Sequence, residues 1–118
     1  MLLSLPTSVR IWLASGATDL RKGFDTLAEL VRQQLQRDPL SGQLFVFRNR
    51  RGDRVKLLYW DEDGFVIVYK RLEAGTFRFP SADAAGLEMR AADLQMLLDG
   101  VEWDSVKRRR RYRRPLPA

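Results

Sequence analysis

Strand-like patterns fill the middle of the chain, from residue 38 to residue 80. Apolar residues there either alternate with polar ones or form short apolar runs, and compact segments rich in Gly, Asp and Asn separate these runs. The runs cover residues 44–48, 54–60, 65–72 and 76–79. Short connections force neighbouring strands to be antiparallel, and Asp63-Gly64 is a strong hairpin signal. The pattern therefore predicts a four-stranded antiparallel meander.

A strand and a helix are predicted ahead of the meander. Alternating apolar residues in 9–13 have the period of a strand, and a Ser-Gly pair follows them. Apolar residues then recur at helical spacing over residues 19–35, and Thr18 or Asp19 can accept hydrogen bonds from the first turn. Gly23 falls inside this predicted helix, where a glycine indicates close packing against the sheet.

A second, shorter helix is expected after the meander. Residues 87–89 suggest a brief strand, and residues 91–99 place three leucines on one helical face. Gly100 stands where a C-terminal cap is common. We expect Val101 and Trp103 to dock this end of the helix onto the core.

The middle strands of the meander are apolar on both faces, so both faces of the sheet need cover. The helix over residues 19–35 can cover one face. The second helix, the N-terminal strand or another protein can cover the other. The predicted fold class is α+β, with an antiparallel four- to five-stranded meander sheet, one long helix packed on a face, a short C-terminal helix and a disordered basic tail.

Composition limits the available chemistry. The 118 residues suit a single domain, and histidine and cysteine are both absent. Their absence excludes disulfides, zinc fingers and any catalytic step that needs a thiolate or an imidazole. No apolar run approaches the roughly 18 residues that a membrane span requires, and the first ten residues lack a basic leader segment. We therefore expect a cytoplasmic protein that does not bind a membrane.

The excess of positive charge belongs to the C-terminal tail. The formal net charge is +6, from 21 lysines and arginines against 15 acids. Seven of these cations stand after residue 104: Lys107, Arg108, Arg109, Arg110, Arg111, Arg113 and Arg114. Without them the remaining chain has 14 cations against 15 acids, a charge of −1. This asymmetry predicts a folded domain over residues 1–104 and a basic tail over 105–118 that is disordered in isolation.

The tail has the composition of a nucleic-acid-binding segment. Guanidinium groups form paired hydrogen bonds with phosphate oxygens, and Tyr112 among them can stack on an exposed base. If all seven cations engaged duplex phosphates, the log-log salt slope of binding would approach about −6. The alternatives are a solubilising tail, incidental RNA binding, or a tether to an acidic protein surface.

A second basic group surrounds the first turn of the meander. It consists of Arg48, Arg50, Arg51 and Arg54, with Lys56 nearby. With a five-residue loop, Arg48 faces Arg54, and this like-charge pair would favour a bound anion. With a two-residue loop centred on residues 51–52, Arg50 instead faces Asp53 and the two can pair. An arginine-bearing ribbon can enter a major groove, but a solvated hairpin tip explains the same residues.

Two further groups carry weaker signals. Asp61, Glu62 and Asp63 could suggest a metal site, but adjacent acids on a tight turn point in different directions. Tyr59, Trp60 and Tyr69 could form a stacking platform, although aromatic residues in strands more often belong to the core. The sequence contains no phosphate-binding glycine loop and no nucleophile elbow. We expect no catalytic residues, no metal site and no cofactor.

Three segments carry a resemblance to a known family. They are FVFRNRRGDRVKLLYWDEDGFVIVYKRLEAGTFRFP in the meander, TDLRKGFDTLAELV at residues 18–31 and LLDGVEW at residues 97–103. Together they resemble the small TnpB-type (Orf2-like) accessory transposition protein of IS66-type insertion sequences, which is unrelated to the RNA-guided nuclease of the same name. The resemblance implies a bacterial mobile-element operon, and it supplies no catalytic residues.

These features favour a non-enzymatic accessory factor for DNA transposition and recombination. Such a factor would assist a separately encoded transposase by binding DNA, the transposase, or both. The alternative is a protein-interaction module without direct DNA contact, in which an exposed sheet edge or face seats a partner. A metal-dependent nuclease would require converging carboxylates that the sequence does not display.

Overall fold

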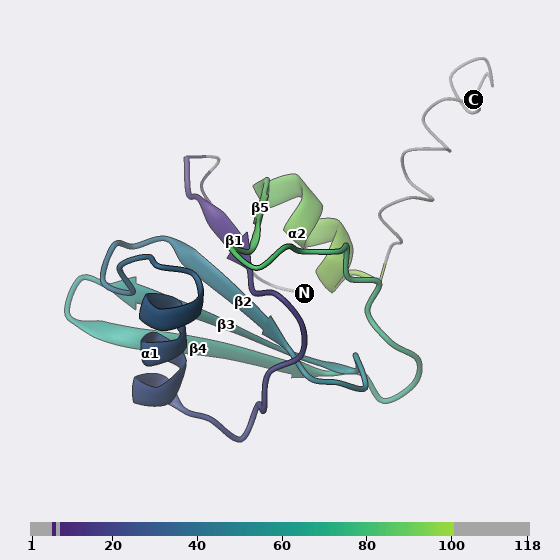
Figure 1. The fold of residues 1–118 in the computed structure, drawn as a ribbon. Helices are drawn as coiled ribbons and strands as arrows, with labels where there is room; N and C mark the ends of the chain where they lie inside the picture. The colour runs from purple at the N-terminus through teal and green to yellow at the C-terminus, as the bar shows by residue number, and fades with distance from the viewer. Residues whose placement is uncertain (1–5, 7, 101–118) are drawn as a thin grey trace, which may run out of the picture.

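A single twisted sheet forms the centre of the molecule (Figure 1). The structure is a computed structural model that describes residue 6 and residues 8–100. Its elements are β1 (Ile11–Leu13), α1 (Phe24–Gln34), β2 (Leu44–Arg48), β3 (Arg54–Asp61), β4 (Gly64–Arg71), β5 (Leu87–Met89) and α2 (Ala91–Leu98). The strands lie in the order β4-β3-β2-β1-β5. The predicted α+β class, the second helix and the brief strand over residues 87–89 are confirmed.

Strands β2, β3 and β4 form the antiparallel meander that the sequence predicts. Glu62 and Asp63 connect β3 to β4, and the positive φ of 52° falls on Glu62 rather than on the Asp-Gly pair. Strand β1, in contrast, runs parallel to β2, with Ile11 opposite Leu44. A wholly antiparallel sheet is therefore not correct, because the chain between β1 and β2 crosses over through α1.

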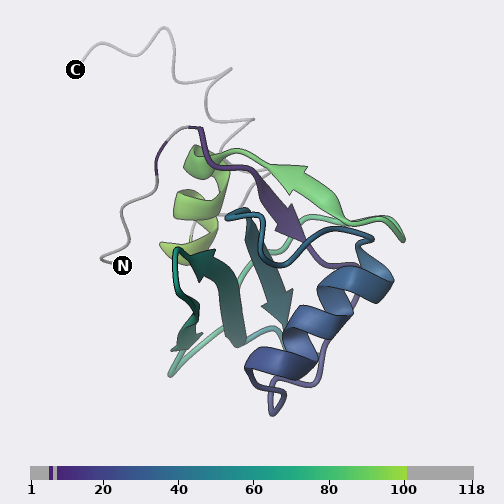
Figure 2. The ribbon, with the colours of Figure 1, turned by 90° about the vertical axis from the view of Figure 1, so that its left-hand side faces the viewer.

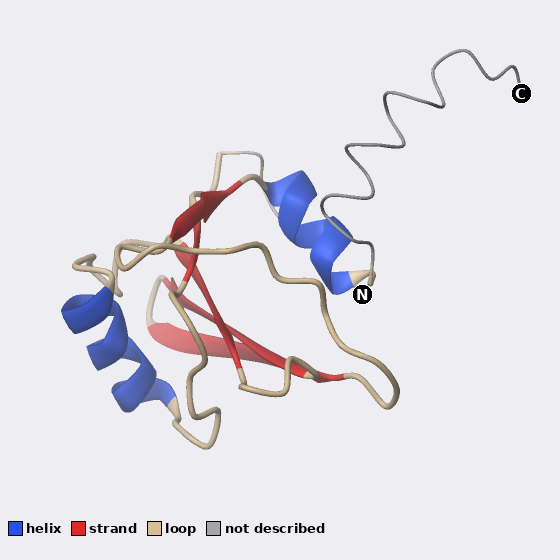
Figure 3. Ribbon diagram, turned by 45° about the vertical axis from the view of Figure 1, so that its right-hand side comes forward, coloured by secondary structure: helices blue, strands red, loops and turns tan. Residues whose placement is uncertain are grey.

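The fourth predicted strand of the meander, residues 76–79, does not form. In Figure 3 the chain between β4 and β5 is drawn as loop. Phe77 is buried as the alternating pattern suggested, but its backbone N–H donates to the carbonyl oxygen of Gly52 at 2.8 Å, in the β2–β3 turn. A hydrophobic alternation predicts which side chains are buried, but a strand also needs a neighbouring ladder.

Helix α1 is shorter than the predicted helix over residues 19–35. Its N-cap is Gly23, which makes no side-chain capping bond and does not pack closely against the sheet. Neither of the two expected caps, Thr18 or Asp19, caps α1; Asp19 instead accepts from the backbone N–H of Arg21 at 3.0 Å and from the Arg21 side chain. Asp19 thus stabilises a turn before the helix, and the weak helix former Gly23 marks where α1 begins.

The two helices lie on opposite sides of the sheet, so each face has its own core (Figure 2). On one face, Leu27 and Val31 of α1 pack with Phe45 of β2. On the other, Leu94 and Leu98 of α2 pack with Val46. The prediction that a second helix could cover the other face is confirmed. Residues 44–47 of β2 and 55–58 of β3 are buried on both faces, whereas β4 at the edge of the sheet is only partly covered.

The predicted docking of Val101 and Trp103 and the predicted basic tail over 105–118 lie outside the described residues. Neither helix of the described part of the chain is long and apolar enough to cross a membrane.

Candidate nucleic-acid interface

The register of the β2–β3 hairpin decides how its arginines are arranged. Arg48 lies opposite Val55, and the backbone N–H of Asn49 donates to the carbonyl oxygen of Arg54 at 3.3 Å. The five-residue loop with Arg48 opposite Arg54 is therefore wrong. The register matches the two-residue alternative, but the ladder ends before the pair of Arg50 and Asp53 can form.

Asn49 organises the turn. Its Oδ1 accepts hydrogen bonds from the backbone N–H groups of Gly52 and Arg54, at 2.9 and 3.1 Å, and its Nδ2 donates to Oδ1 of Asp53 at 2.7 Å. Asparagine suits this role because its short amide can satisfy backbone groups of its own loop. Asn49 was not among the predicted residues, although its place at the end of a strand before a glycine-containing turn was a usable signal.

The chain after β4 supports the β2–β3 turn through backbone hydrogen bonds. The carbonyl oxygens of Gly52 and Asp53 accept from the backbone N–H groups of Phe77 and Leu72, each at 2.8 Å. Gly52 has a φ of +82°, a conformation that suits glycine because other residues would place a Cβ against their own carbonyl. These bonds fix the turn to the buried Phe77, so the arginines on it project from a supported loop.

The four predicted arginines of the turn do not share one face of the sheet. Arg54 belongs to the row of β3 that faces α1, whereas Arg48 belongs to the row of β2 that faces α2, because side chains alternate along a strand. Arg50 and Arg51 lie between them and border a hollow on either side of the turn. Arg50 and Arg51 therefore border both hollows, whereas Arg48 and Arg54 lie on opposite faces of the sheet.

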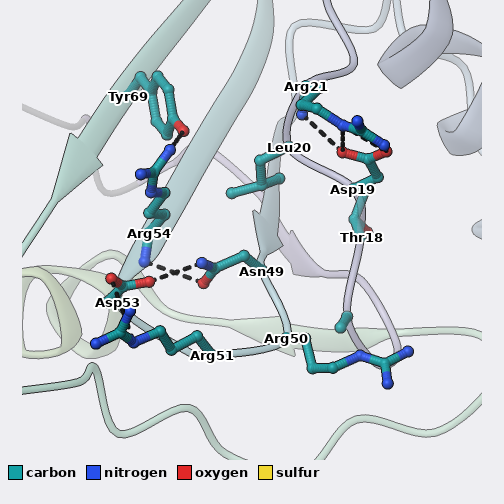
Figure 4. A pocket seen from close by; sticks show the side chains of 11 residues that line it. Thr18, Asp19, Leu20, Arg21, Asn49, Arg50, Arg51, Asp53, Arg54 and Tyr69 are labelled. Atoms are coloured by element: carbon teal, nitrogen blue, oxygen red, sulfur yellow. Dashed lines mark hydrogen bonds and ion pairs between the residues drawn. The ribbon is translucent and has the colours of Figure 1, made fainter.

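The hollow on the α1 side has a volume of about 510 Å³ (Figure 4). Residues 17–21 of the loop after β1, the β2–β3 turn and Tyr69 line it. The backbone N–H of Thr18 donates to the carbonyl oxygen of Arg48 at 2.7 Å, which fastens the loop to the end of β2. Lys56 is buried and its Nζ donates to the carbonyl oxygen of Lys22 at 2.8 Å, so this lysine supports the loop rather than facing solvent.

Cations outnumber acids around this hollow, where Arg21 joins Arg50, Arg51 and Arg54 against Asp19 and Asp53. The Arg21 guanidinium binds both carboxylate oxygens of Asp19 and holds the pKa of that carboxyl far below its ordinary value. The pKa of Asp53 is lowered chiefly by the amide of Asn49, then by its own backbone N–H, and more weakly by Arg51, whose Nε lies 3.9 Å from a carboxylate oxygen of Asp53. Both acids therefore remain charged at neutral pH, yet they neutralise only part of the cluster.

Arg50 and Arg51 are the most available cations of the turn. Arg50 makes no ion pair or hydrogen bond within the described residues, and in Figure 4 its guanidinium points away from the two aspartates. The side chain of Arg51 is 83% exposed, and its contact with Asp53 is long for an ion pair. Both guanidinium groups can bind an anion without first breaking a strong contact.

A like-charge pair extends the basic surface to β4. Arg54 lies directly opposite Arg71, and Nη1 of Arg54 donates to the hydroxyl of Tyr69 at 3.1 Å. Arg71 also binds Glu73 at 2.9 Å, an exposed pair that contributes little stability. Arg21 and Arg71 were not predicted from the sequence, because only the loop after β1 and the β3–β4 register bring them to the turn.

On the α2 side, a second hollow of about 530 Å³ lies between the turn and residues 76–82. Arg48 borders it, donates to the carbonyl oxygen of Asn49 at 3.3 Å and lies 5.8 Å from the ring of Phe79. These contacts tie Arg48 to the fold. The seven cations of the predicted tail lie outside the described residues.

The other two candidate groups do not assemble into sites. Tyr59 packs with the core on the α2 side, whereas Trp60 packs against Phe65 and lies on the α1 side with Tyr69, so the three rings do not form one platform. Among the described residues, no three acidic side chains come together in a way that could hold a metal ion.

Comparison with known proteins identifies the family. Two proteins of Sinorhizobium fredii, each named only as an uncharacterized protein, are similar over most of their length. The protein y4hO is 43% identical over 96 residues, which cover 81% of this chain and 84% of y4hO. The protein y4jC is 39% identical over 101 residues, 86% of each chain. No solved structure matches. The family model described as IS66 Orf2 like protein matches residues 9–108, and the chain therefore belongs to that family.

Proposed function

We propose that this protein is a non-enzymatic accessory factor for transposition of an insertion sequence, and that it binds DNA phosphates through the arginines of the β2–β3 turn. The observation that carries the proposal is the supported turn on which Arg50 and Arg51 stand without strong partners. Membership of the IS66 Orf2-like family supports the link to transposition. The basic tail, from Lys107 to Arg114, adds a second set of phosphate contacts.

The proposed contact is electrostatic and therefore does not depend on the DNA sequence. Guanidinium groups that reach phosphates provide affinity and orientation but carry no base-specific information. The element-encoded transposase would then supply the choice of DNA ends, and this protein would help to hold the DNA near it. In this role the protein needs neither a metal nor a cofactor.

DNA binding can be tested with salt titrations on a labelled terminal repeat and on random DNA. The full chain is compared with the double variant Arg50→Gln/Arg51→Gln and with a chain truncated after Asp104. We expect the double variant to reduce the salt slope by up to about 1.8 and the truncation to reduce it by up to about 6. The matched control Arg10→Gln/Arg32→Gln removes two cations from exposed ion pairs elsewhere and should leave binding nearly unchanged.

Equal binding by the full chain, the double variant and the truncated chain would refute the proposed DNA contact. The alternative function, a protein-interaction module, has its own test, which is co-purification with the transposase after nuclease treatment. Survival of the complex would favour direct protein contact, and loss of the complex would favour a DNA bridge.

A further inference from the structure

The two edge strands of the sheet differ in length. The edge strand β5 has three residues, whereas the opposite edge strand, β4, has eight. Within the described part of the chain, β4 has a neighbouring strand on one side only. Monomeric proteins usually keep edge strands short or interrupt them with charged residues, proline or bulges. The centre of β4, residues 65–69, contains none of these and reads Phe-Val-Ile-Val-Tyr.

The hairpin register fixes which backbone groups of β4 point outward. Asp61 and Gly64 close a two-residue turn, so they form a hydrogen-bonded pair, and every second residue of β4 after Gly64 bonds to β3. The backbone N–H and C=O groups of Phe65, Ile67 and Tyr69 therefore face away from the sheet. The side chains at the same positions are only partly covered, and Tyr69 is 47% exposed.

These outward groups are self-complementary. If a second copy adds its β4 antiparallel to the first, with Ile67 on the two-fold axis, then Phe65 of each copy lies opposite Tyr69 of the other. All the residues so paired have outward-facing backbone groups, so both strands can complete their hydrogen bonds in one register. The pairing also places aromatic side chains across from each other, which is a favourable cross-strand combination.

Charge selects the same register. β4 begins after the acidic turn of residues 61–63 and ends with Lys70 and Arg71. In the antiparallel arrangement about Ile67, Asp63 of one copy lies next to Arg71 of the other, and the axis repeats this contact. A parallel arrangement would bring acids next to acids and bases next to bases, which costs stability.

We propose that two copies of this chain associate through their β4 edges into a symmetric dimer with one continuous sheet. The two β2–β3 turns would then lie at opposite ends of that sheet, because each turn adjoins the Arg71 end of its own β4. The dimer does not depend on DNA binding. The two proposals are therefore separable, and oligomeric state can be measured on nuclease-treated protein without DNA.

Sedimentation equilibrium on the full chain tests the dimer across the micromolar range. We expect concentration-dependent dimerisation of the wild type. Asp63→Arg alone and Arg71→Asp alone should each raise the dissociation constant by about tenfold, because the axis repeats the reversed contact. An equimolar mixture of the two variants should recover wild-type association, because both contacts in the mixed dimer join opposite charges. Circular dichroism checks that each variant is folded.

The matched control is Asp83→Arg, which makes the same change of charge in the loop before β5, at the opposite edge of the sheet. Its dissociation constant should equal that of the wild type. A wild type that stays monomeric throughout the range would overturn the proposal. A dimer that responds equally to Asp63→Arg and Asp83→Arg, or a mixture that fails to recover association, would also overturn it.

Discussion

Arg54 and Arg71 lie directly opposite each other across the β3–β4 ladder. Two like charges in this position repel, and the Tyr69 hydroxyl, the Glu73 carboxylate and the charge of Asp53 moderate the repulsion. The pair therefore contributes little to stability but concentrates positive charge beside the β2–β3 turn. DNA binding and folding stability can therefore be measured separately on variants of this pair.

The first prediction concerns Arg54→Gln. The change removes the repulsion with Arg71 and weakens an exposed hydrogen bond to Tyr69, so the free energy of unfolding should change by less than about 0.5 kcal/mol. If the turn binds DNA, the salt slope should fall by up to about 0.9. Urea unfolding and fluorescence anisotropy measure the two quantities. Arg32→Gln, which breaks an exposed pair with Glu29 on α1, should leave DNA binding unchanged.

The second prediction concerns the side-chain amide of Asn49. Asn49→Ala leaves the N–H of Arg54 without its side-chain acceptor, leaves the N–H of Gly52 with only the backbone carbonyl of residue 49 at 3.3 Å, and removes the donor to Asp53. Urea unfolding should show a loss of about 1–3 kcal/mol. Asn49→Asp keeps the acceptor but sets a carboxylate beside Asp53, so it should destabilise the protein chiefly by charge repulsion that added salt reduces. An unchanged midpoint for Asn49→Ala would contradict this account of the turn.

The third prediction concerns acid. The amide of Asn49 lowers the pKa of Asp53 below its ordinary value of 3.8. A carboxyl whose pKa is lower in the folded state stabilises that state fully above pH 3.8, and this contribution is lost as the pH falls through the folded pKa. Asp53→Asn should therefore flatten the decline of the free energy of unfolding below about pH 4. Unfolding curves recorded from pH 6 to below pH 4 measure the free energy of unfolding of the wild type and of Asp53→Asn. Parallel declines for the two proteins would contradict the prediction.

The fourth prediction uses two glycines with positive φ. A Cβ on Gly86, at φ +88°, would lie 2.7 Å from Cδ2 of Leu35 and 2.9 Å from the carbonyl oxygen of Leu13. Gly86→Ala combines backbone strain with this overlap and should cost about 2–4 kcal/mol in thermal or urea unfolding. Gly75→Ala, at φ +74° with no atom within 4 Å, isolates the strain and should cost about 1–2 kcal/mol. Equal losses would show that the overlap relaxes at no cost.

The sequence by itself determined the local elements with strong periodic signals. The β2–β3–β4 meander, the short α2 with Gly100 after it, and the need to cover both faces of the sheet all followed from apolar spacing and short turns. The charge division at residue 104 and the family resemblance were also readable from the chain alone. These features depend on residues close together in sequence, which is why pattern and composition sufficed.

Only the tertiary structure decided the features that depend on distant partners. Contacts that the apolar pattern does not reveal decided three features. Strand β1 pairs in parallel with β2, and residues 76–79 form a hydrogen bond to Gly52 instead of a strand. Helix α1 begins only after the turn that Asp19 stabilises. The same holds for the basic surface, where a strand register placed Arg71 rather than Arg48 opposite Arg54. A shift of one residue reverses the face of every side chain in a strand, so the composition of a turn cannot fix which of its charges lie together.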